Sequence, residues 1–463
     1  MHSHLGKRWD KTLQLIAPLI LAACGGSKTH ENVAEVNKIE GSPNSDYIQA
    51  TKDDELIITL SGNDRIYAEG GDDQIFPSPG SDTVYAGDGD DKINIEDLGD
   101  YVDGGAGIDT FVIVGSLLTG PLSIDFRTGI IEAGESIFEP RTEFSSVENF
   151  EASNLAQFTI YTARDDNSIS TGPADDVLYL SGGNDKVVTS EGADTVTILT
   201  GSHNLSLGDG DDFVTFNGGS QTIDGGTGID TLEFNASRET QLTVNVSEGE
   251  LRGTTEIFGQ FAQIEKYTIG GSPVTFTGTE QSETFTGSDY DDEFYGGGGS
   301  DTYQGNGGSD LFSISTIGQS YTTIADLDIL GEQDVIQISR DGVNVTSNGE
   351  SIFTVDASIA GPKVFTTQGS IIRVISETGF DTEQQVLLAI NGSNGISTPS
   401  AIILQNANVV TIWHDQSTGT SKISLLQDQN SNGTLDFIST IATLENISQQ
   451  DLSEITSDSF VIV

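Results

Sequence analysis

Aspartates recur every nine residues between residues 69 and 111, in EGGDDQIFPSPGSDTVYAGDGDDKINIEDLGDYVDGGAGIDTF. An apolar residue follows each of them two positions later, as Ile75 follows Asp73 and Val84 follows Asp82. Carboxylates that are held close together repel strongly once water is partly excluded. Calcium removes this repulsion, because it takes about six to eight oxygen ligands and glycine-rich turns can present backbone carbonyls beside the acids. The chemistry that this spacing predicts is therefore the binding of several calcium ions.

The nine-residue step extends over three blocks, which we place at residues 39–114, 160–234 and 276–314. In all three blocks the candidate metal ligands are the aspartates two residues before an apolar position. They are Asp46, Asp64, Asp73, Asp82, Asp91, Asp100 and Asp109 in the first block, Asp176, Asp194, Asp212 and Asp230 in the second, and Asp292, Asp301 and Asp310 in the third.

A period of nine fits neither a helix nor a simple alternating strand. It fits a strand of about three residues followed by a glycine-rich turn, with two such units in each 18-residue coil. One coil cannot bury its own apolar side chains, so neighbouring coils must supply the core. Turns on the same side then come from every second repeat, and their acids stack at roughly 4.8 Å per coil. The alternative is a metal-free solenoid with solvated acidic turns.

The coil geometry predicts an asymmetry in the second block. One side of that block has the unbroken set Asp176, Asp194, Asp212 and Asp230, whereas the other side reads Asn167, Asp185, His203 and Gln221. Because the second set lacks carboxylate pairs, we expect this block to bind calcium mainly on one side. His203 is interpreted as a surface residue that fills a ligand position.

Several segments carry a family resemblance. The segments SGNDRIYAEGGDDQIF, GDGDDKI, SGGNDKVV, GDGDDFV and GGGGSDTYQGNGGSDLF resemble the RTX nonapeptide of hemolysin-type calcium-binding proteins. The resemblance covers about half of the chain. It implies an all-β fold, a parallel β-roll, whose calcium ligands are the repeat aspartates and turn carbonyls. The leading glycine pair is often replaced, for example by Ala68–Glu69 and Pro77–Ser78.

The first 23 residues predict a lipoprotein signal peptide. Basic residues precede the apolar run TLQLIAPLILAAC, which is too short for a membrane span of about 20 residues. The run ends in LAAC, which resembles a bacterial lipobox, so Cys24 is the candidate lipidation site and residues 24–38 form a tether. An ordinary signal peptide is the alternative. Both versions place the protein outside the cytoplasm, either as an outer-membrane or cell-surface lipoprotein or in secreted form.

The remaining segments predict further strands. Residues 115–159 and 235–275 are read as strand-rich inserts of similar layout, which suggests a tandem duplication, and residues 315–463 as a C-terminal β domain. In that domain DQNSNGTLD spaces Asp428, Asn430, Asn432 and Asp436 like a calcium loop, although a surface turn explains it equally well. The final SDSFVIV resembles the tail of type I secretion substrates and also reads as a last strand.

The net charge of −52 argues against nucleic acid as a partner. No H-E-x-x-H or G-x-S-x-G motif is present, and no cysteine nucleophile follows the tether, so we predict no enzyme. We expect a calcium-binding scaffold or adhesion module that folds on calcium binding, with a cell-surface polysaccharide or protein as candidate partner. The alternative is a secreted carbohydrate-active β-solenoid enzyme of the polysaccharide epimerase or lyase type.

Overall fold

The computed structural model describes residues 37–113, 118, 120–134, 140–153, 155–236, 241–315, 321–328, 334–338, 352–356, 371–375, 380–386, 408–427, 437–452, 454–455 and 459–462. Cys24 with the predicted leader, residues 24–36 of the predicted tether and the predicted loop at residues 428–436 lie outside the described residues. The last two residues of the predicted tether, Asn37 and Lys38, lie in a strand. The chain divides into two units, Met1–Asn37 and Lys38–Val463, and the structure described below is that of the second unit.

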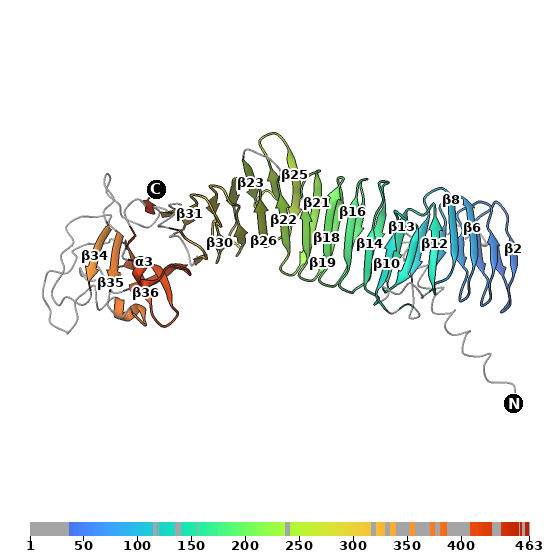
Figure 1. The fold of residues 1–463 in the computed structure, drawn as a ribbon, viewed down its shortest axis with the longest axis horizontal. Helices are drawn as coiled ribbons and strands as arrows, with labels where there is room; N and C mark the ends of the chain where they lie inside the picture. Colours follow the sequence, from blue (N-terminus) through green and yellow to red (C-terminus); the bar gives the residue numbers. More distant parts are fainter. Residues whose placement is uncertain are drawn as a thin grey trace, which may run out of the picture. The chain divides into compact units, whose positions relative to one another are not determined.

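Short strands in the first block alternate between two parallel sheets, A and B (Figure 1). Partners in neighbouring coils are 18 residues apart, as Ile48 pairs with Ile66 and Ile57 with Ile75. Sheet A contains β1 (Asn37–Glu40), β3 (Glu55–Ile58), β5 (Gln74–Phe76), β7 (Lys92–Asn94) and β9 (Thr110–Ile113). Sheet B contains β2 (Tyr47–Gln49), β4 (Arg65–Tyr67), β6 (Thr83–Asp88) and β8 (Tyr101–Ala106). The predicted all-β parallel roll is confirmed, although β6 and β8 are six residues long rather than three.

The second and third blocks continue both sheets. In sheet A they add β15 (Ser168–Ser170), β17 (Lys186–Val188), β19 (Asn204–Asp209), β21 (Gln221–Thr227), β27 (Val274–Thr277), β29 (Glu293–Tyr295) and β31 (Leu311–Ile314). In sheet B they add β14 (Phe158–Tyr161), β16 (Val177–Ser181), β18 (Thr195–Thr200), β20 (Phe213–Phe216), β22 (Thr231–Asn235), β28 (Thr284–Thr286) and β30 (Thr302–Gln304).

The core consists of the apolar side chains that the nine-residue pattern marks. Ile66, Val84 and Leu178 are completely buried. In the third block aromatic rings fill the same positions, and the ring centroid of Phe294 lies 5.2 Å from that of Phe276 and 5.0 Å from that of Phe312. Each buried aliphatic or aromatic side chain contributes roughly 1.5–3 kcal/mol of transfer free energy, so the core accumulates along the stack, coil by coil.

Each predicted insert adds a three-stranded antiparallel meander to one sheet and a single strand to the other. In the first insert, β10 (Leu122–Asp125), β11 (Ile130–Ala133) and β12 (Arg141–Ser145) join β8 to β14 in sheet B, while β13 (Asn149–Ala152) continues sheet A. In the second, β23 (Leu242–Asn245), β24 (Glu250–Arg252) and β25 (Ile257–Ala262) lie in sheet A, and β26 (Lys266–Gly270) continues sheet B. The two meanders therefore lie in opposite sheets.

The C-terminal segment also joins the two sheets. Sheet A continues through β33 (Val335–Ile338) to β39 (Phe460–Ile462), so SDSFVIV contains a final strand. Sheet B continues through β32 (Thr322–Ile324) to β38 (Phe437–Leu444), followed by β37 (Thr420–Gln427), β36 (Asn408–Asp415), β35 (Ile371–Ile375) and β34 (Ile352–Asp356). Strands β36 and β37 pair in antiparallel fashion, and α3 (Gln449–Leu452) follows β38. Within the described ranges, no helix has the length and apolar character needed to cross a membrane.

Candidate metal centres

Each of the fourteen predicted aspartates lies next to the start of a strand, where a turn enters the sheet. Asp46 is partly buried, and the other thirteen expose 4% of their surface or less. Asp91, Asp109 and Asp176 are completely inaccessible. The alternative of solvated acidic turns is therefore wrong for the thirteen buried aspartates, because water does not reach their side chains.

In all of these aspartates except Asp46, one carboxylate oxygen accepts a hydrogen bond from a backbone N–H of the preceding coil. The backbone N–H of Asp73 donates to Asp91 Oδ1 at 2.8 Å, and that of Asp91 donates to Asp109 Oδ1 at 2.9 Å. The same bond links Asp176 to Asp194 at 2.7 Å across 18 residues. A charged acceptor is a strong partner for a backbone N–H. Each aspartate therefore ties two coils together even before any metal is considered.

The second oxygen of many of these carboxylates has no partner. Buried Oδ2 atoms without a hydrogen-bond partner occur in Asp64, Asp73, Asp82, Asp91, Asp109, Asp176, Asp194, Asp212 and Asp230. Leaving a charged oxygen desolvated and unpaired is costly. An acceptor-only atom in this position needs a cation or a proton. Stacked carboxylates with turn carbonyls beside them are the oxygen-rich set that calcium prefers, so the residues fit this ion.

The turn backbone leaves room for that second oxygen. A Cβ on Gly104 would lie 2.4 Å from Asp109 Oδ2, and one on Gly225 would lie 2.5 Å from Asp230 Oδ2. Where the expected glycine pair is missing, Glu69 and Ser78 still adopt left-handed backbone angles, with φ of 78° and 64°. Non-glycine residues pay about 1–2 kcal/mol for this conformation. The turn shape is thus kept even where the sequence departs from glycine.

The other five predicted ligands have no unpartnered buried oxygen. They are Asp46, Asp100, Asp292, Asp301 and Asp310. For two of them the reason is local, because Ser42 N–H donates to Asp46 Oδ2 at 2.5 Å and Ser288 N–H donates to Asp292 Oδ2 at 2.6 Å. In both cases the serine stands four residues before the acid. A serine at this position is a sequence signal for a carboxylate that is already partly satisfied.

Burial raises the pKa of most of the predicted ligands. It raises the pKa of Asp73, Asp82, Asp100, Asp109, Asp194 and Asp301 to about 7, and that of Asp310 to about 8. It raises the pKa of Asp91, Asp176, Asp230 and Asp292 to about 6, and it also raises the pKa of Asp212. Near neutral pH the carboxyls whose pKa is raised to about 7 or 8 are therefore protonated in part unless a cation compensates for the lost hydration.

Comparison with known families agrees with this geometry. The sequence model of the RTX calcium-binding nonapeptide repeat matches the chain in four copies, at residues 49–84, 78–94, 161–196 and 277–312. The chain carries RTX calcium-binding repeats. Repeats of this family bind calcium, so the ion predicted from the spacing is also the ion of the family. A comparison with curated proteins finds no match.

Three acids that continue the stacks of turn carboxylates were not among the ligands predicted from the sequence. Asp109 N–H donates to Glu148 Oε2 at 2.9 Å, and Asp230 N–H donates to Glu265 Oε2 at 2.9 Å, so a glutamate carries the ladder into each insert. Asp310 N–H donates to Asp334 Oδ1 at 2.9 Å, which extends the third block. Each of the three precedes a buried ring or aliphatic side chain by two residues, namely Phe150, Tyr267 and Ile336. The same acid-then-apolar pattern could have identified them.

The second RTX block differs between its two sides, as its sequence indicates. We call Asp176, Asp194, Asp212 and Asp230, which precede strands of sheet B, the acidic ladder. We call Asn167, Asp185, His203 and Gln221, at the turns of sheet A, the mixed ladder. The interpretation of His203 as a surface residue is wrong, since it exposes only 2% and both ring nitrogens have partners. Its ring fills the interior of a turn, a position that a one-dimensional pattern does not distinguish from an exposed loop.

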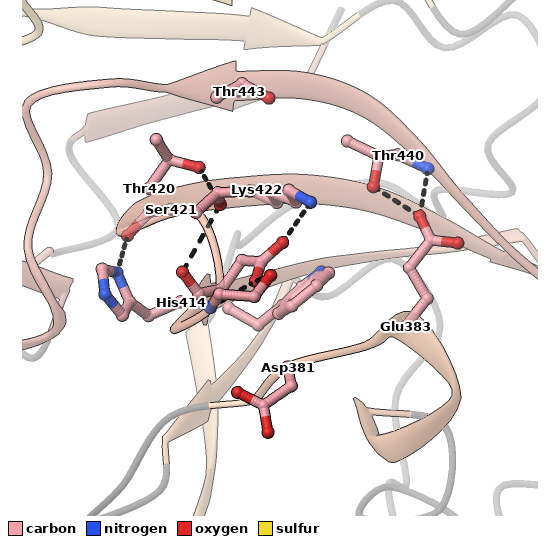
Figure 2. Close-up of polar contacts among 12 residues, drawn as sticks. Asp381, Glu383, His414, Thr420, Ser421, Lys422, Thr440 and Thr443 are labelled. Atoms are coloured by element: carbon pink, nitrogen blue, oxygen red, sulfur yellow. Dashed lines mark hydrogen bonds and ion pairs between the residues drawn. The ribbon is translucent and has the colours of Figure 1, made fainter.

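No group of three or more His, Cys, Asp or Glu side chains in the described ranges converges on one point. Calcium also binds sets of carboxylate and main-chain carbonyl oxygens, which do not require three such side chains at one point. The other described histidine, His414, lies in the C-terminal sheet beside Ser421 (Figure 2). Ser421 donates its hydroxyl proton to Ile447 O at 2.8 Å, so at Oγ it accepts from the His414 ring. This polarity is the reverse of an activated serine nucleophile.

The same region contains a polar cluster with a structural explanation. Lys422 Nζ pairs with Asp415 and lies 5.2 Å from the ring centroid of Trp413. Glu383 accepts a hydrogen bond from the Thr440 hydroxyl at 2.6 Å (Figure 2). The Lys422 ammonium is the chief influence that holds the pKa of Asp415 down to about 2, despite the opposing effect of burial. These contacts join the strands to the short segment at residues 380–386.

Proposed function

We propose that calcium bridges stacked turn carboxylates in the three RTX blocks and that this binding drives the roll to fold. The observation that carries the proposal is the set of nine buried carboxylates that each leave one oxygen without a partner. The five predicted aspartates without such an oxygen are secondary ligands. Bound calcium supplies positive charge to these oxygens. The chain supplies the spacing, the turn carbonyls and the exclusion of water.

The electrostatics support coupled folding. The chain has a net charge of −52, and like charges that are brought together in the coil oppose compaction. Without a cation, the ladder acids must hold protons at a pH where free aspartates have lost them. Binding free energy then becomes folding free energy, as in other metal-dependent domains. Extracellular calcium modules bind at about 10⁻⁴–10⁻³ M, so the chain would stay expanded at cytosolic calcium levels and coil outside.

The proposed location is outside the cytoplasm, with Cys24 lipidated and residues 24–36 acting as a tether, since Asn37 and Lys38 belong to β1. There the roll acts as a scaffold or adhesion module that contacts a cell-surface polysaccharide or protein. Support comes from the apolar leader that ends in LAAC and from the calcium dependence argued above. Labelling cells with a radioactive fatty acid tests the anchor. Label should enter the wild-type chain and be absent from Cys24→Ser, and label in neither chain contradicts the anchor.

The decisive experiment compares circular dichroism and hydrodynamic radius with calcium and with a chelator. We expect full β-structure and a compact chain only with calcium. The triple variant Asp73→Asn, Asp91→Asn and Asp109→Asn should lose part of the calcium uptake of the first block. A matched control replaces Asp72, Asp90 and Asp103 by asparagine, because none of these three is in the buried ladder. Equal structure in chelator and calcium would refute coupled folding.

A further inference from the structure

The mixed ladder reproduces the hydrogen bonds of the acidic ladder with different acceptors. Asn167 N–H donates to Asp185 Oδ1 at 2.9 Å, Asp185 N–H to His203 Nδ1 at 3.1 Å, and His203 N–H to Gln221 Oε1 at 2.8 Å. Each bond spans 18 residues, like the bond between Asp176 and Asp194. An imidazole nitrogen and an amide oxygen therefore replace carboxylate oxygens without changing the register of the coils.

The remaining polar atoms of His203 and Gln221 are donors rather than acceptors. Gln221 Nε2 donates to Gly218 O in its own turn and to Gly201 O in the preceding turn, both at 3.0 Å. His203 Nε2 lies 2.9 Å from Thr200 O, and a carbonyl can only accept, so this nitrogen carries a hydrogen. Side-chain N–H groups thus bind turn carbonyls that would otherwise be available to a cation.

The single carboxylate of the mixed ladder is also satisfied. Asp185 Oδ2 accepts from the Thr162 hydroxyl at 3.2 Å, in contrast with the unpartnered Oδ2 atoms of the acidic ladder. The same oxygen lies 3.2 Å from His203 Nδ1, but that nitrogen accepts the Asp185 N–H and so donates no hydrogen bond to it. Among the mixed-ladder side chains described, Asn167 Oδ1 is the buried atom without a partner, and it is neutral. Burying an unpaired neutral oxygen costs far less than burying an unpaired charge.

We infer that the mixed ladder is a calcium-independent clasp, by which we mean that it holds its coils together without a metal ion. Its side-chain N–H groups bind the turn carbonyls, in the way that bound calcium does on the acidic ladder. The coils around β17, β19 and β21 then stay stacked when calcium is absent. In a solenoid each coil is stabilised mainly by its neighbours, so one persistent segment can serve as the template for the rest. The inference rests on the proposed function only in taking calcium as the ion of the acidic ladder.

Hydrogen exchange on the wild-type chain in chelator tests the clasp directly. The backbone amides of Asp185 and His203 should exchange at least about tenfold more slowly than those of Asp194 and Asp212, because only the first pair belongs to a ladder with its charges satisfied. Equally fast exchange on both ladders in chelator overturns the clasp but leaves calcium-coupled folding intact. Protection that is the same with and without calcium on both ladders overturns the proposed function instead.

A double variant converts the clasp into a calcium ladder. His203→Asp with Gln221→Asp places three aspartates on this side, with Asp185, and should raise the bound calcium by roughly one to two ions per chain. In chelator the variant should lose the protection of the Asp185 amide. The matched control, Asn204→Asp with Thr222→Asp, makes the same charge change at exposed neighbouring positions. Unchanged calcium uptake with retained protection overturns the inference, and the wild-type exchange measurement decides the matter even if the double variant does not fold.

Discussion

Replacing Asp194 by asparagine should have opposite effects with and without calcium. Asp194 stands between Asp176 and Asp212 on the acidic ladder, so it borders two inter-turn spaces. The amide oxygen of Asn can keep the 2.7 Å bond from Asp176 N–H, whereas its NH₂ group points to where Oδ2 has no partner. The substitution therefore removes a cation ligand and a buried charge, and it leaves the coil register unchanged.

The expected loss of stability follows from the two calcium ions that we place between the turns of Asp176, Asp194 and Asp212. With a dissociation constant of about 10⁻⁴–10⁻³ M, calcium at about 10 mM stabilises the folded chain by about 1.4–2.7 kcal/mol per ion. Loss of both ions bordering Asp194 therefore lowers the calcium-dependent stabilisation by about 3–5 kcal/mol. In chelator the variant should be at least as compact as wild type, since one desolvated charge is gone.

Urea unfolding in calcium and in chelator, together with calcium counting by equilibrium dialysis, measures both effects. Asp224→Asn is the matched control, because Asp224 is exposed on β21 and its loss makes the same charge change outside the ladders. The reasoning is refuted if Asp194→Asn binds as much calcium as Asp224→Asn and unfolds at the same urea concentration.

Three further predictions concern pH, turns and core. Burial raises the pKa of the buried turn aspartates above the ordinary 3.8, so the metal-free roll should be most stable below about pH 4 and should lose that stability as the pH rises to about 7. Size-exclusion chromatography in chelator should therefore show a smaller radius at pH 5 than at pH 8, and equal radii would contradict this prediction. Gly208→Ala should destabilise the folded chain by more than about 1 kcal/mol in thermal unfolding, because φ of Gly208 is 106° and the new Cβ would lie 1.7 Å from Ser190 O. The control Gly218→Ala should leave the stability unchanged, because its Cβ would meet nothing within 4 Å. Phe294→Ala should cost about 3–5 kcal/mol in urea unfolding with saturating calcium, and Phe294→Leu clearly less; similar losses would argue against a tightly packed ring stack.

The nine-residue period was enough to predict the coil, its core and the acids at the turns. The period does not reveal that one oxygen of each carboxylate is already bonded to a backbone N–H of the preceding coil. That bond depends on the three-dimensional closeness of residues 18 apart, as in Asp73 and Asp91. The pattern also misassigned His203, because a position inside a tight turn and one on its surface carry the same label in sequence.

The placement of the inserts was within reach of the sequence. The segment GGAGIDTF ends on Phe111, in sheet A, and GGTGIDTL ends on Leu232, in sheet B. Because successive strands alternate between the two sheets, the strand after Phe111 should enter sheet B and the strand after Leu232 should enter sheet A. The alternation therefore predicts the first meander in sheet B and the second in sheet A. Antiparallel pairing within each meander was not predictable in register, because their alternating apolar residues permit several hairpin alignments.

Glu148 and Glu265 show how the architecture tolerates changes in length. Asp109 reaches its acceptor 39 residues away and Asp230 reaches its acceptor 35 residues away, yet both distances are 2.9 Å, as in the uninterrupted bond from Asp91 to Asp109. One acid at the position where the coil resumes after the insert is enough to restore the hydrogen bond between coils. Genetic gain or loss of whole coils would therefore lengthen or shorten the stack of coils while the remaining neighbours keep their contacts, so the number of coils can change without a change of fold.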